Sequence, residues 1–251
     1  MIKISHLTKS FENKIAVNQI DLEVSNELFI FLGPNGAGKT TTIKMMTGLL
    51  KPDEGEVTLN GIDIARQPLA AKAQFGYVPE QPNLYEKLTP REFIDFIIRV
   101  YKAPYKPAMR RMQQLFDIFE IADRADDLIE EFSSGMQKKV SLIAALVHQP
   151  KILFLDEPTV ALDPKAARNL KDILRGLIKK GVTIFMTTHI LEVAESMCDR
   201  IGIINKGELC AVGSMSELRS QYGDNLSLEE LFLKLTGEAY SSKIENFLQD
   251  A

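Results

Sequence analysis

The sequence has no tryptophan, three histidines and two cysteines, and its apolar runs are short. Cys198 and Cys210 show no pairing pattern, which predicts a reducing compartment and inert thiols rather than a disulfide framework. No stretch approaches the roughly 18 apolar residues that a membrane-spanning helix requires. Residues 1–6, MIKISH, are too polar for a secretory signal. We therefore expect a cytoplasmic chain.

The charge balance is close to even. The chain has 30 basic and 34 acidic side chains, a formal net charge of -4. This balance gives no general attraction to nucleic acid or anionic lipid, so no nucleic-acid partner is expected. With 251 residues, 45% of them hydrophobic and 25% charged, the composition is that of an ordinary globular protein of one or two domains.

The apolar pattern predicts two kinds of strand. Near the N-terminus apolar residues alternate with polar ones, as in half-buried strands, at Ile2, Ile4, Leu7, Ile20, Leu22 and Val24. Later runs are apolar without alternation, at residues 28–32, 152–155, 182–186 and 201–204. Strands that are apolar on both sides belong in a parallel sheet covered by helices, and residues 164–180 form one such predicted helix. The class is therefore α/β, with a mainly parallel sheet.

A helical segment interrupts this core. Between residues 90 and 149 the strand pattern disappears, and apolar residues recur at helical spacing. Beyond Gly213, capping boxes at Ser214 and Ser227 predict two further helices. We expect one domain, in which residues 1–89 and 150–212 form the core, 90–149 an inserted helical subdomain and 213–251 a C-terminal helical extension.

Residues 33–40, GPNGAGKT, match the complete P-loop pattern between a buried strand and a helix. Glycines let backbone N–H groups curl around a polyphosphate, and the helix directs its positive end at the same charge. Lys39 can reach the β- and γ-phosphates, and Thr40 offers a hydroxyl to Mg²⁺. The predicted nucleotide-binding residues are Gly33, Pro34, Asn35, Gly36, Ala37, Gly38, Lys39, Thr40 and Thr41.

A second motif, ILFLDEP at residues 152–158, is a buried strand that ends in two acids. This pattern suits a Walker B site, in which Asp156 holds Mg²⁺ and Glu157 acts as general base on the attacking water. Residues 205–208, NKGE, are similar to a guanine-reading motif but have Glu in place of Asp. Because they follow the last core strand, we expect a turn there.

Residues 132–137, FSSGMQ, open a predicted helix between these two sites. With this order of motifs, residues 2–237 resemble the ATP-binding subunits of ABC transporters, especially the ABC-2-type cassettes of multidrug-, ion- or peptide-exporting systems. In that family a signature loop, typically LSGGQ, binds the γ-phosphate of the opposite subunit. The residues in its place are Ser133, Ser134, Gly135 and Met136, and Ser134 replaces a glycine.

The resemblance implies further roles. Asp163 corresponds to the D-loop at the dimer interface, His189 to the histidine that contacts the γ-phosphate, and Phe11 to the aromatic residue that stacks on adenine. The family's Q-loop glutamine is ambiguous here. Counting back from Leu84 and Tyr85 gives Glu80 that position, with Gln81 next to it. The implied Mg²⁺ ligands are Thr40, Asp156 and Glu80, and the implied catalytic residues are Glu157 and His189.

The resemblance thus implies a P-loop ATPase that uses ATP and Mg²⁺. Its partners would be a second cassette, identical or different, and an integral membrane permease, so the chain would lie peripherally on the inner face of the cell membrane. The tail at residues 228–237 resembles that of exporter cassettes. Two alternatives remain: a soluble ABC ATPase of translation or DNA maintenance, and a weakly hydrolysing regulatory cassette. The sequence does not identify the transported substrate.

Overall fold

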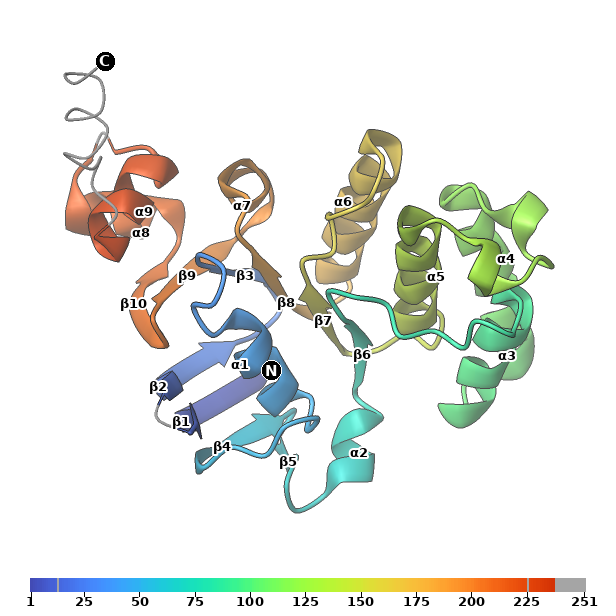
Figure 1. Cartoon of the computed structure of the whole chain (residues 1–251), viewed down its shortest axis with the longest axis horizontal. Coiled ribbons are helices and arrows are strands. Elements are labelled where there is room, and N and C mark those ends of the chain that lie inside the picture. The colour runs from blue at the N-terminus through green and yellow to red at the C-terminus, as the bar shows by residue number, and fades with distance from the viewer. Residues whose placement is uncertain (13, 225, 238–251) are drawn as a thin grey trace.

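The computed structural model describes residues 1–12, 14–224 and 226–237 (Figure 1). Its centre is a six-stranded sheet in the order β10-β9-β3-β8-β7-β6. The strands are β3 (Leu28–Leu32), β6 (Phe75–Val78), β7 (Ile152–Asp156), β8 (Thr183–Thr188), β9 (Arg200–Asn205) and β10 (Glu208–Gly213). All neighbours are parallel except the edge pair β9 and β10, which confirms the mainly parallel sheet. Residues 206–207 form the expected turn between that pair.

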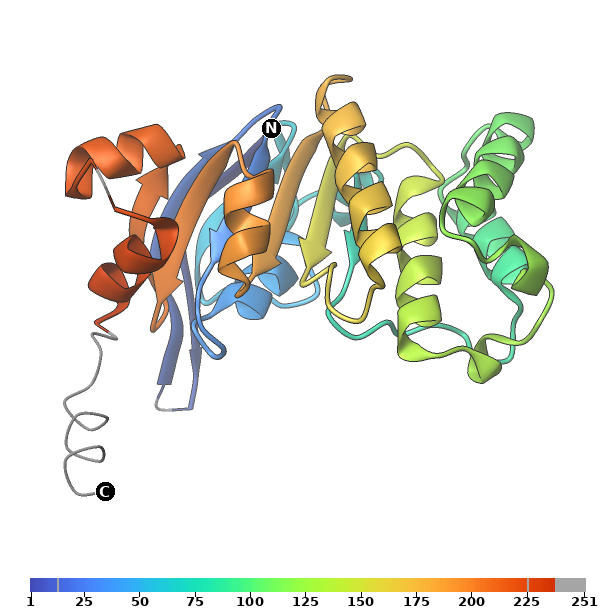
Figure 2. The same ribbon diagram turned by 90° about the horizontal axis from the view of Figure 1, so that it is seen from above.

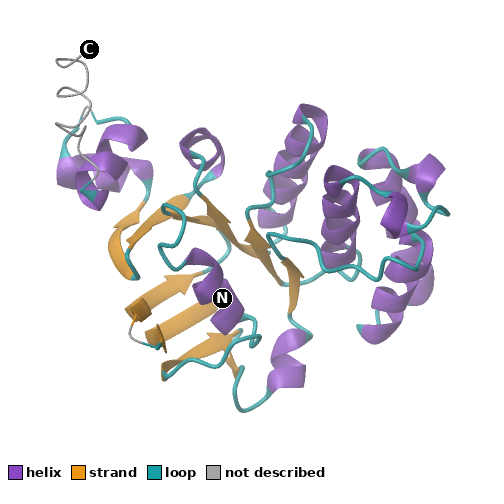
Figure 3. Cartoon of the chain, viewed as in Figure 1, coloured by secondary structure: helices purple, strands orange, loops and turns teal. Residues whose placement is uncertain are grey.

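A second sheet contains the N-terminal strands. Its order is β2-β1-β4-β5, and its pairs are antiparallel. The strands are β1 (Ile2–Phe11), β2 (Lys14–Val24), β4 (Glu54–Leu59) and β5 (Ile62–Asp63), and Figure 3 shows them below the larger sheet. The alternating pattern predicted β1 and β2, and the structure confirms both.

The central strand β3 divides the core in two because successive strand residues face opposite sides of a sheet. Phe29 and Phe31 pack with the antiparallel sheet and α1 (Lys39–Met46). Leu28, Ile30 and Leu32 pack with α6 (Pro164–Ile178) and α7 (Leu191–Met197) on the other face. Figure 2 shows these two layers on either side of the sheet. The β3 residues are buried on both faces, as the continuous apolar run predicted.

The helical insertion is present as predicted. It contains α3 (Pro90–Val100), α4 (Tyr105–Ile118) and α5 (Ser134–Leu146), with 3-10 turns at Ala122–Arg124 and Ile129–Glu131. A short helix, α2 (Pro68–Lys72), precedes β6. Just beyond α5, the His148 ring stacks on Tyr101 with ring centroids 3.8 Å apart. This contact joins the end of α3 to the segment that leads from α5 back into the core.

The chain continues beyond β10 in α8 (Met215–Tyr222) and α9 (Leu228–Thr236). Both predicted capping boxes form, at Ser214 with Glu217 and at Ser227 with Glu230. Residues 238–251 of the expected C-terminal extension lie outside the described residues. No helix in the described part of the chain is long and apolar enough to cross a membrane.

Candidate functional site

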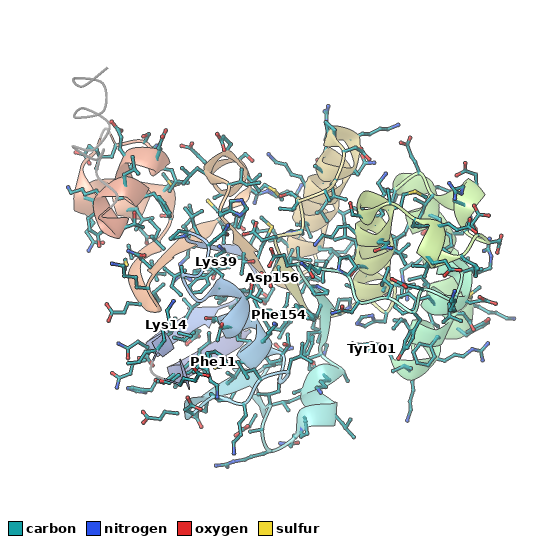
Figure 4. All side chains as sticks on the ribbon, in the orientation of Figure 1. Phe11, Lys14, Lys39, Tyr101, Phe154 and Asp156 are labelled. Atoms are coloured by element: carbon teal, nitrogen blue, oxygen red, sulfur yellow. The ribbon has the colours of Figure 1, made fainter. Side chains whose placement is uncertain are left out.

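Four segments carry the predicted site residues to one edge of the large sheet. The P-loop follows β3, Glu80 follows β6, Asp156 ends β7 and His189 follows β8. Parallel strands present their carboxyl ends on the same side, where α/β proteins bind ligands. Figure 4 shows Lys39 and Asp156 near the centre, with Phe11 and Lys14 at the ends of the antiparallel strands.

Local backbone geometry positions the P-loop. Gly38 has φ of 110°, and a Cβ there would lie 2.4 Å from the carbonyl oxygen of Ala16, so only glycine fits. Helix α1 begins at the next residue, Lys39. The Lys39 side chain is buried, and its Nζ donates to the carbonyl oxygens of Gly33 at 2.7 Å and Pro34 at 3.2 Å. A triphosphate would compete with these carbonyl groups for the ammonium.

A pocket of about 450 Å³ brings many of the predicted residues together. It is lined by Phe11, Lys14, Ala16, Asn35, Gly36, Gly38, Lys39, Thr40, Thr41, Glu80 and Glu157. Gly33 and Ala37 are buried rather than lining, Pro34 is half-buried, and His189 stands outside the lining set. Sequence reasoning missed Lys14, which lies opposite Phe11 in the β1–β2 pairing. The signal was present in the hairpin register, which places a cation beside the expected adenine-stacking ring.

The acidic pair at the end of β7 is buried. Asp156 is fully buried, and its Oδ1 accepts a hydrogen bond from the Thr187 hydroxyl. Glu157 has φ of 47° and is 4% exposed. Its Oε1 lies 2.9 Å from His189 Nδ1 and 3.5 Å from Lys39 Nζ. The carboxylate of Glu157 is therefore held between a histidine and the P-loop ammonium.

The oxygen atoms of this pair fit a hard cation. Among the described residues, Asp156 Oδ2 and Glu157 Oε2 are buried without a hydrogen-bond partner, and an unpartnered buried carboxylate oxygen is costly. Thr40, Glu80 and Asp156 line one pocket together. Hydroxyl and carboxylate oxygens are ligands that Mg²⁺ accepts alongside water and phosphate oxygens. The residues present thus fit a magnesium ion.

The two Q-loop candidates differ in the pockets that they line. Glu80 lines the nucleotide-sized pocket and also a second pocket of about 570 Å³, whereas Gln81 lines only the second. Burial raises the pKa of the nearby Tyr77 hydroxyl, and the charges of Asp156 and Glu80 raise it further. Glu80 is the candidate that faces both the phosphate side and the helical side.

The signature residues lie apart from the pocket of their own chain. Ser133 caps α5, and its hydroxyl accepts from the Met136 N–H at 3.3 Å. Ser134 is the first helical residue, a conformation that serine adopts without strain. Ser133 and Ser134 are exposed, while Gly135 and Met136 are half-buried. These residues are absent from the pocket lining, so within one chain they do not meet the P-loop.

The D-loop segment packs directly against the signature helix. A Cβ on Gly135 would lie 2.6 Å from the carbonyl oxygen of Ala161, so the two backbones approach too closely for a side chain. Asp163 caps α6 through the Ala166 N–H and forms an ion pair with Lys139 at 2.8 Å. This pair holds the pKa of the Asp163 carboxyl below its ordinary value. Signature and D-loop therefore form one surface.

The second pocket lies between the core and the helical insertion. Its lining includes Lys44 and Lys72 from the core side and Phe93, Tyr101 and His148 from the helical side. Burial lowers the pKa of the His148 imidazole.

The cysteines are half-buried free thiols, and burial raises the pKa of Cys198 to about 11, in line with the expected inert role.

Comparison with known proteins gives a consistent result. A family model described as ABC transporter matches residues 17–160. The linearmycin resistance ATP-binding protein LnrL of Bacillus subtilis is 36% identical over 230 residues, 91% of this chain and 74% of that protein. The Nod factor export ATP-binding protein I of Burkholderia lata is 37% identical over 214 residues, 85% of this chain and 70% of that protein.

Solved structures share the fold. An ATP-binding subunit of an ABC transporter superimposes with a TM-score of 0.90 and 33% identity, covering 94% of this chain and 99% of that one. A dimeric post-hydrolysis state of the cassette MJ0796, bound to ADP and Pi, gives a TM-score of 0.78 at 26% identity, covering 86% of this chain and 99% of that one.

Proposed function

Since the chain belongs to the ABC transporter family of ATP-binding proteins, we propose that it hydrolyses ATP as the motor of an exporter, with Glu157 and His189 as catalytic residues. One observation carries the proposal. The P-loop and Glu157 line one pocket of about 450 Å³, and His189 Nδ1 lies 2.9 Å from Glu157 Oε1. Export is supported by the relatives, one named for drug resistance and one for Nod factor export.

The pocket residues divide the work of hydrolysis. Lys39 exchanges its bonds to Gly33 and Pro34 for phosphate oxygens. Glu157 orients the attacking water and accepts its proton, while His189 fixes the Glu157 carboxylate. The resemblance to the family gives His189 a second role, contact with the γ-phosphate. Thr40, Asp156 and Glu80 would hold Mg²⁺, and the bound ion would neutralise charge on the phosphates. Phe11, 47% exposed at the pocket rim, stacks on the adenine.

A second cassette completes the site. The exposed Ser133 and Ser134 present a hydroxyl-rich helix N-terminus, which suits a phosphate held by another chain. The D-loop at Asp163 lies on the same surface as the signature. Head-to-tail pairing of two copies, or of this chain with a different cassette, brings each signature to the opposite P-loop. The similar cassette MJ0796, in its post-hydrolysis state bound to ADP and Pi, is described as dimeric.

The membrane permease docks at the pocket of about 570 Å³ between core and helical insertion. Exposed apolar side chains lie on both parts of this region: Leu49 lines the pocket from the core, and on the helical side the exposed Tyr85 packs against Phe96 and against the pocket residue Phe93. Grouped exposed apolar side chains of this kind are a feature of protein interaction sites. Docking there places the chain peripherally on the cytoplasmic face of the membrane, and it places the permease beside Glu80, which touches both pockets.

The test of catalysis is Glu157→Gln. We expect nucleotide affinity within about threefold of the parent and turnover reduced by at least about 100-fold, because the amide keeps the shape of the side chain and loses its basicity. Glu192→Gln, an exposed carboxylate in the first turn of α7, is the matched control. Undiminished turnover in Glu157→Gln removes that residue from the chemistry. Negligible turnover in the parent itself favours the regulatory alternative.

The test of transport uses the same variant. Tagged Glu157→Gln is expressed in the native host, membranes are solubilised in mild detergent with ATP and Mg²⁺, and the co-purifying proteins are identified. We expect a polytopic membrane protein in stoichiometric amount. Recovery with ribosomes, DNA or only another cassette overturns the transport function while leaving the ATPase in place.

A further inference from the structure

One buried cation has no part in the proposed hydrolysis. Lys138 on α5 is 2% exposed, and its Nζ donates to the carbonyl oxygens of Pro79 at 2.9 Å and Glu80 at 2.7 Å. A buried ammonium is costly unless hydrogen bonds and nearby charges compensate it. Burial lowers the pKa of Lys138, and the charges of Asp156, Glu80 and Glu157 raise it. Lys138 therefore belongs to the electrostatic environment of the catalytic carboxylates.

The position of this lysine in the fold is informative. Helix α5 begins with the signature residues, and Lys138 lies one turn after Ser134. The two carbonyl groups that it binds follow β6 and belong to the Q-loop. Farther along, α5 packs closely on β6, since a Cβ on Gly76 would lie 2.2 Å from the carbonyl oxygen of Ala145. Lys138 thus adds two hydrogen bonds between α5 and the segment that follows β6.

The balance of carboxylates and ammonium groups at the site also favours a role for Lys138. The expected Q-loop amide is replaced by Glu80, so this chain has three carboxylates near the phosphates, at residues 80, 156 and 157. The P-loop ammonium of Lys39 lies 3.5 Å from Glu157. Lys138 adds a second positive charge on the side of Glu80. A neutral residue at position 138 would leave Glu80 without this nearby counter-charge and its backbone without two hydrogen bonds.

We propose that Lys138 is a positioning residue that fixes the Pro79–Glu80 backbone, and thereby holds the Glu80 carboxylate in its working place at the ATP site. Its catalytic consequence rests on the proposed ATPase function. The geometric part, a link between the signature helix and the Q-loop, does not. Through this link a displacement of the signature helix is transmitted to the residue that faces both the nucleotide and the permease.

The geometric part is tested without nucleotide. Trypsin cleavage after the exposed Lys87 reports release of the loop that begins at Pro79. We expect Lys138→Met to raise this cleavage rate at least about fivefold, and Lys138→Arg to keep it within about twofold of the parent. Lys139→Met, which removes the adjacent lysine that pairs with Asp163, is the matched control. An unchanged rate in Lys138→Met overturns the proposal.

The catalytic part is tested by a double-mutant cycle with Glu80→Gln. Lys138→Met is expected to lower kcat about tenfold or more with KM for ATP within about threefold, and Lys138→Arg to restore it. The double variant should be no slower than the slower single variant. If Lys138 acts only by positioning Glu80, both substitutions remove the same contribution to kcat. Multiplicative losses overturn the positioning role. If Lys138→Met does not fold by circular dichroism, Lys138→Gln, which keeps an N–H donor, replaces it.

The two tests also separate the hypotheses. A parent protein without ATPase activity refutes the proposed function, while the trypsin experiment still decides whether Lys138 holds the loop.

Discussion

The hydroxyl of Thr187 is expected to stabilise the folded chain more than any other threonine hydroxyl of β8. It donates to Asp156 Oδ1 and accepts from the Glu157 N–H at 3.2 Å. Asp156 is fully buried, and among the described residues its other carboxylate oxygen has no partner. Thr187→Val keeps the side-chain shape and removes the hydrogen bond on which this carboxylate depends.

The magnitude follows from the charge of the acceptor. A hydrogen bond to a charged group contributes about 1.5–3 kcal/mol, and a neutral one about 1 kcal/mol. The Glu157 N–H keeps a second bond to the Thr187 carbonyl oxygen, so little is lost there. We expect Thr187→Val to lower the free energy of unfolding by about 2–3 kcal/mol. For a chain of this size that corresponds to a fall in Tm of roughly 4–12 °C.

The assay is urea unfolding of the nucleotide-free protein, with Tm as a second readout. Thr188→Val is the matched control on the same strand, because Thr188 is equally buried and its hydroxyl accepts from the neutral Ile190 N–H at 3.1 Å. Thr187→Ser keeps a hydroxyl and should lose about 1 kcal/mol or less. A Thr187→Val loss no larger than that of Thr188→Val would refute the reasoning. The loss should also shrink in an Asp156→Asn background, where the acceptor is neutral.

Two further outcomes follow from the structure. Phe11→Ala should weaken ATP and GTP binding about equally, by roughly 5- to 150-fold in equilibrium titrations, because base stacking contributes about 1–3 kcal/mol. The control is Ile15→Ala on the same hairpin, where the side chain is 52% exposed, and it should change neither affinity. Native Cys198, with its pKa raised by burial to about 11 from 9.0, should react with iodoacetamide at pH 8 roughly 100-fold more slowly than in the unfolded chain. Because the folded thiol binds its proton more tightly, its contribution to stability is present below pH 9 and is lost as pH rises toward 11; equal labelling rates in the two states would contradict the burial argument.

Local pattern predicted the parts of the fold whose environment is uniform. Strand β3 is buried on both faces, so its five residues are all apolar and the signal is plain. Strand β6 was missed because it has four residues, one of them Gly76, and forms only by pairing with β7. In β4, only Val57 and Leu59 are buried, too few to display an alternation. Such strands are specified by partners distant in the sequence.

The same division applies to the site. The P-loop and the acidic pair are contiguous motifs, so sequence alone predicted most of the pocket lining. Lys14 enters the lining through hairpin register. Lys138 donates to carbonyl groups 58 and 59 residues away in the sequence. A contact over that separation cannot be predicted from the spacing of nearby residues. The different pocket linings of Glu80 and Gln81 depend on how the segment after β6 packs, which no local sequence pattern displays.

The position of β3 has a consequence for synthesis of the chain. Its two sheet neighbours are β8 and β9, which begin at Thr183 and Arg200. At a translation rate of about 5–20 residues per second, roughly ten to thirty seconds pass between the emergence of β3 and that of β9. During that interval the run Leu28–Leu32 lacks both strands that cover its edges. The nascent chain therefore displays its P-loop on an unpaired, wholly apolar strand, and this segment is the one a ribosome-associated chaperone would have most reason to shield.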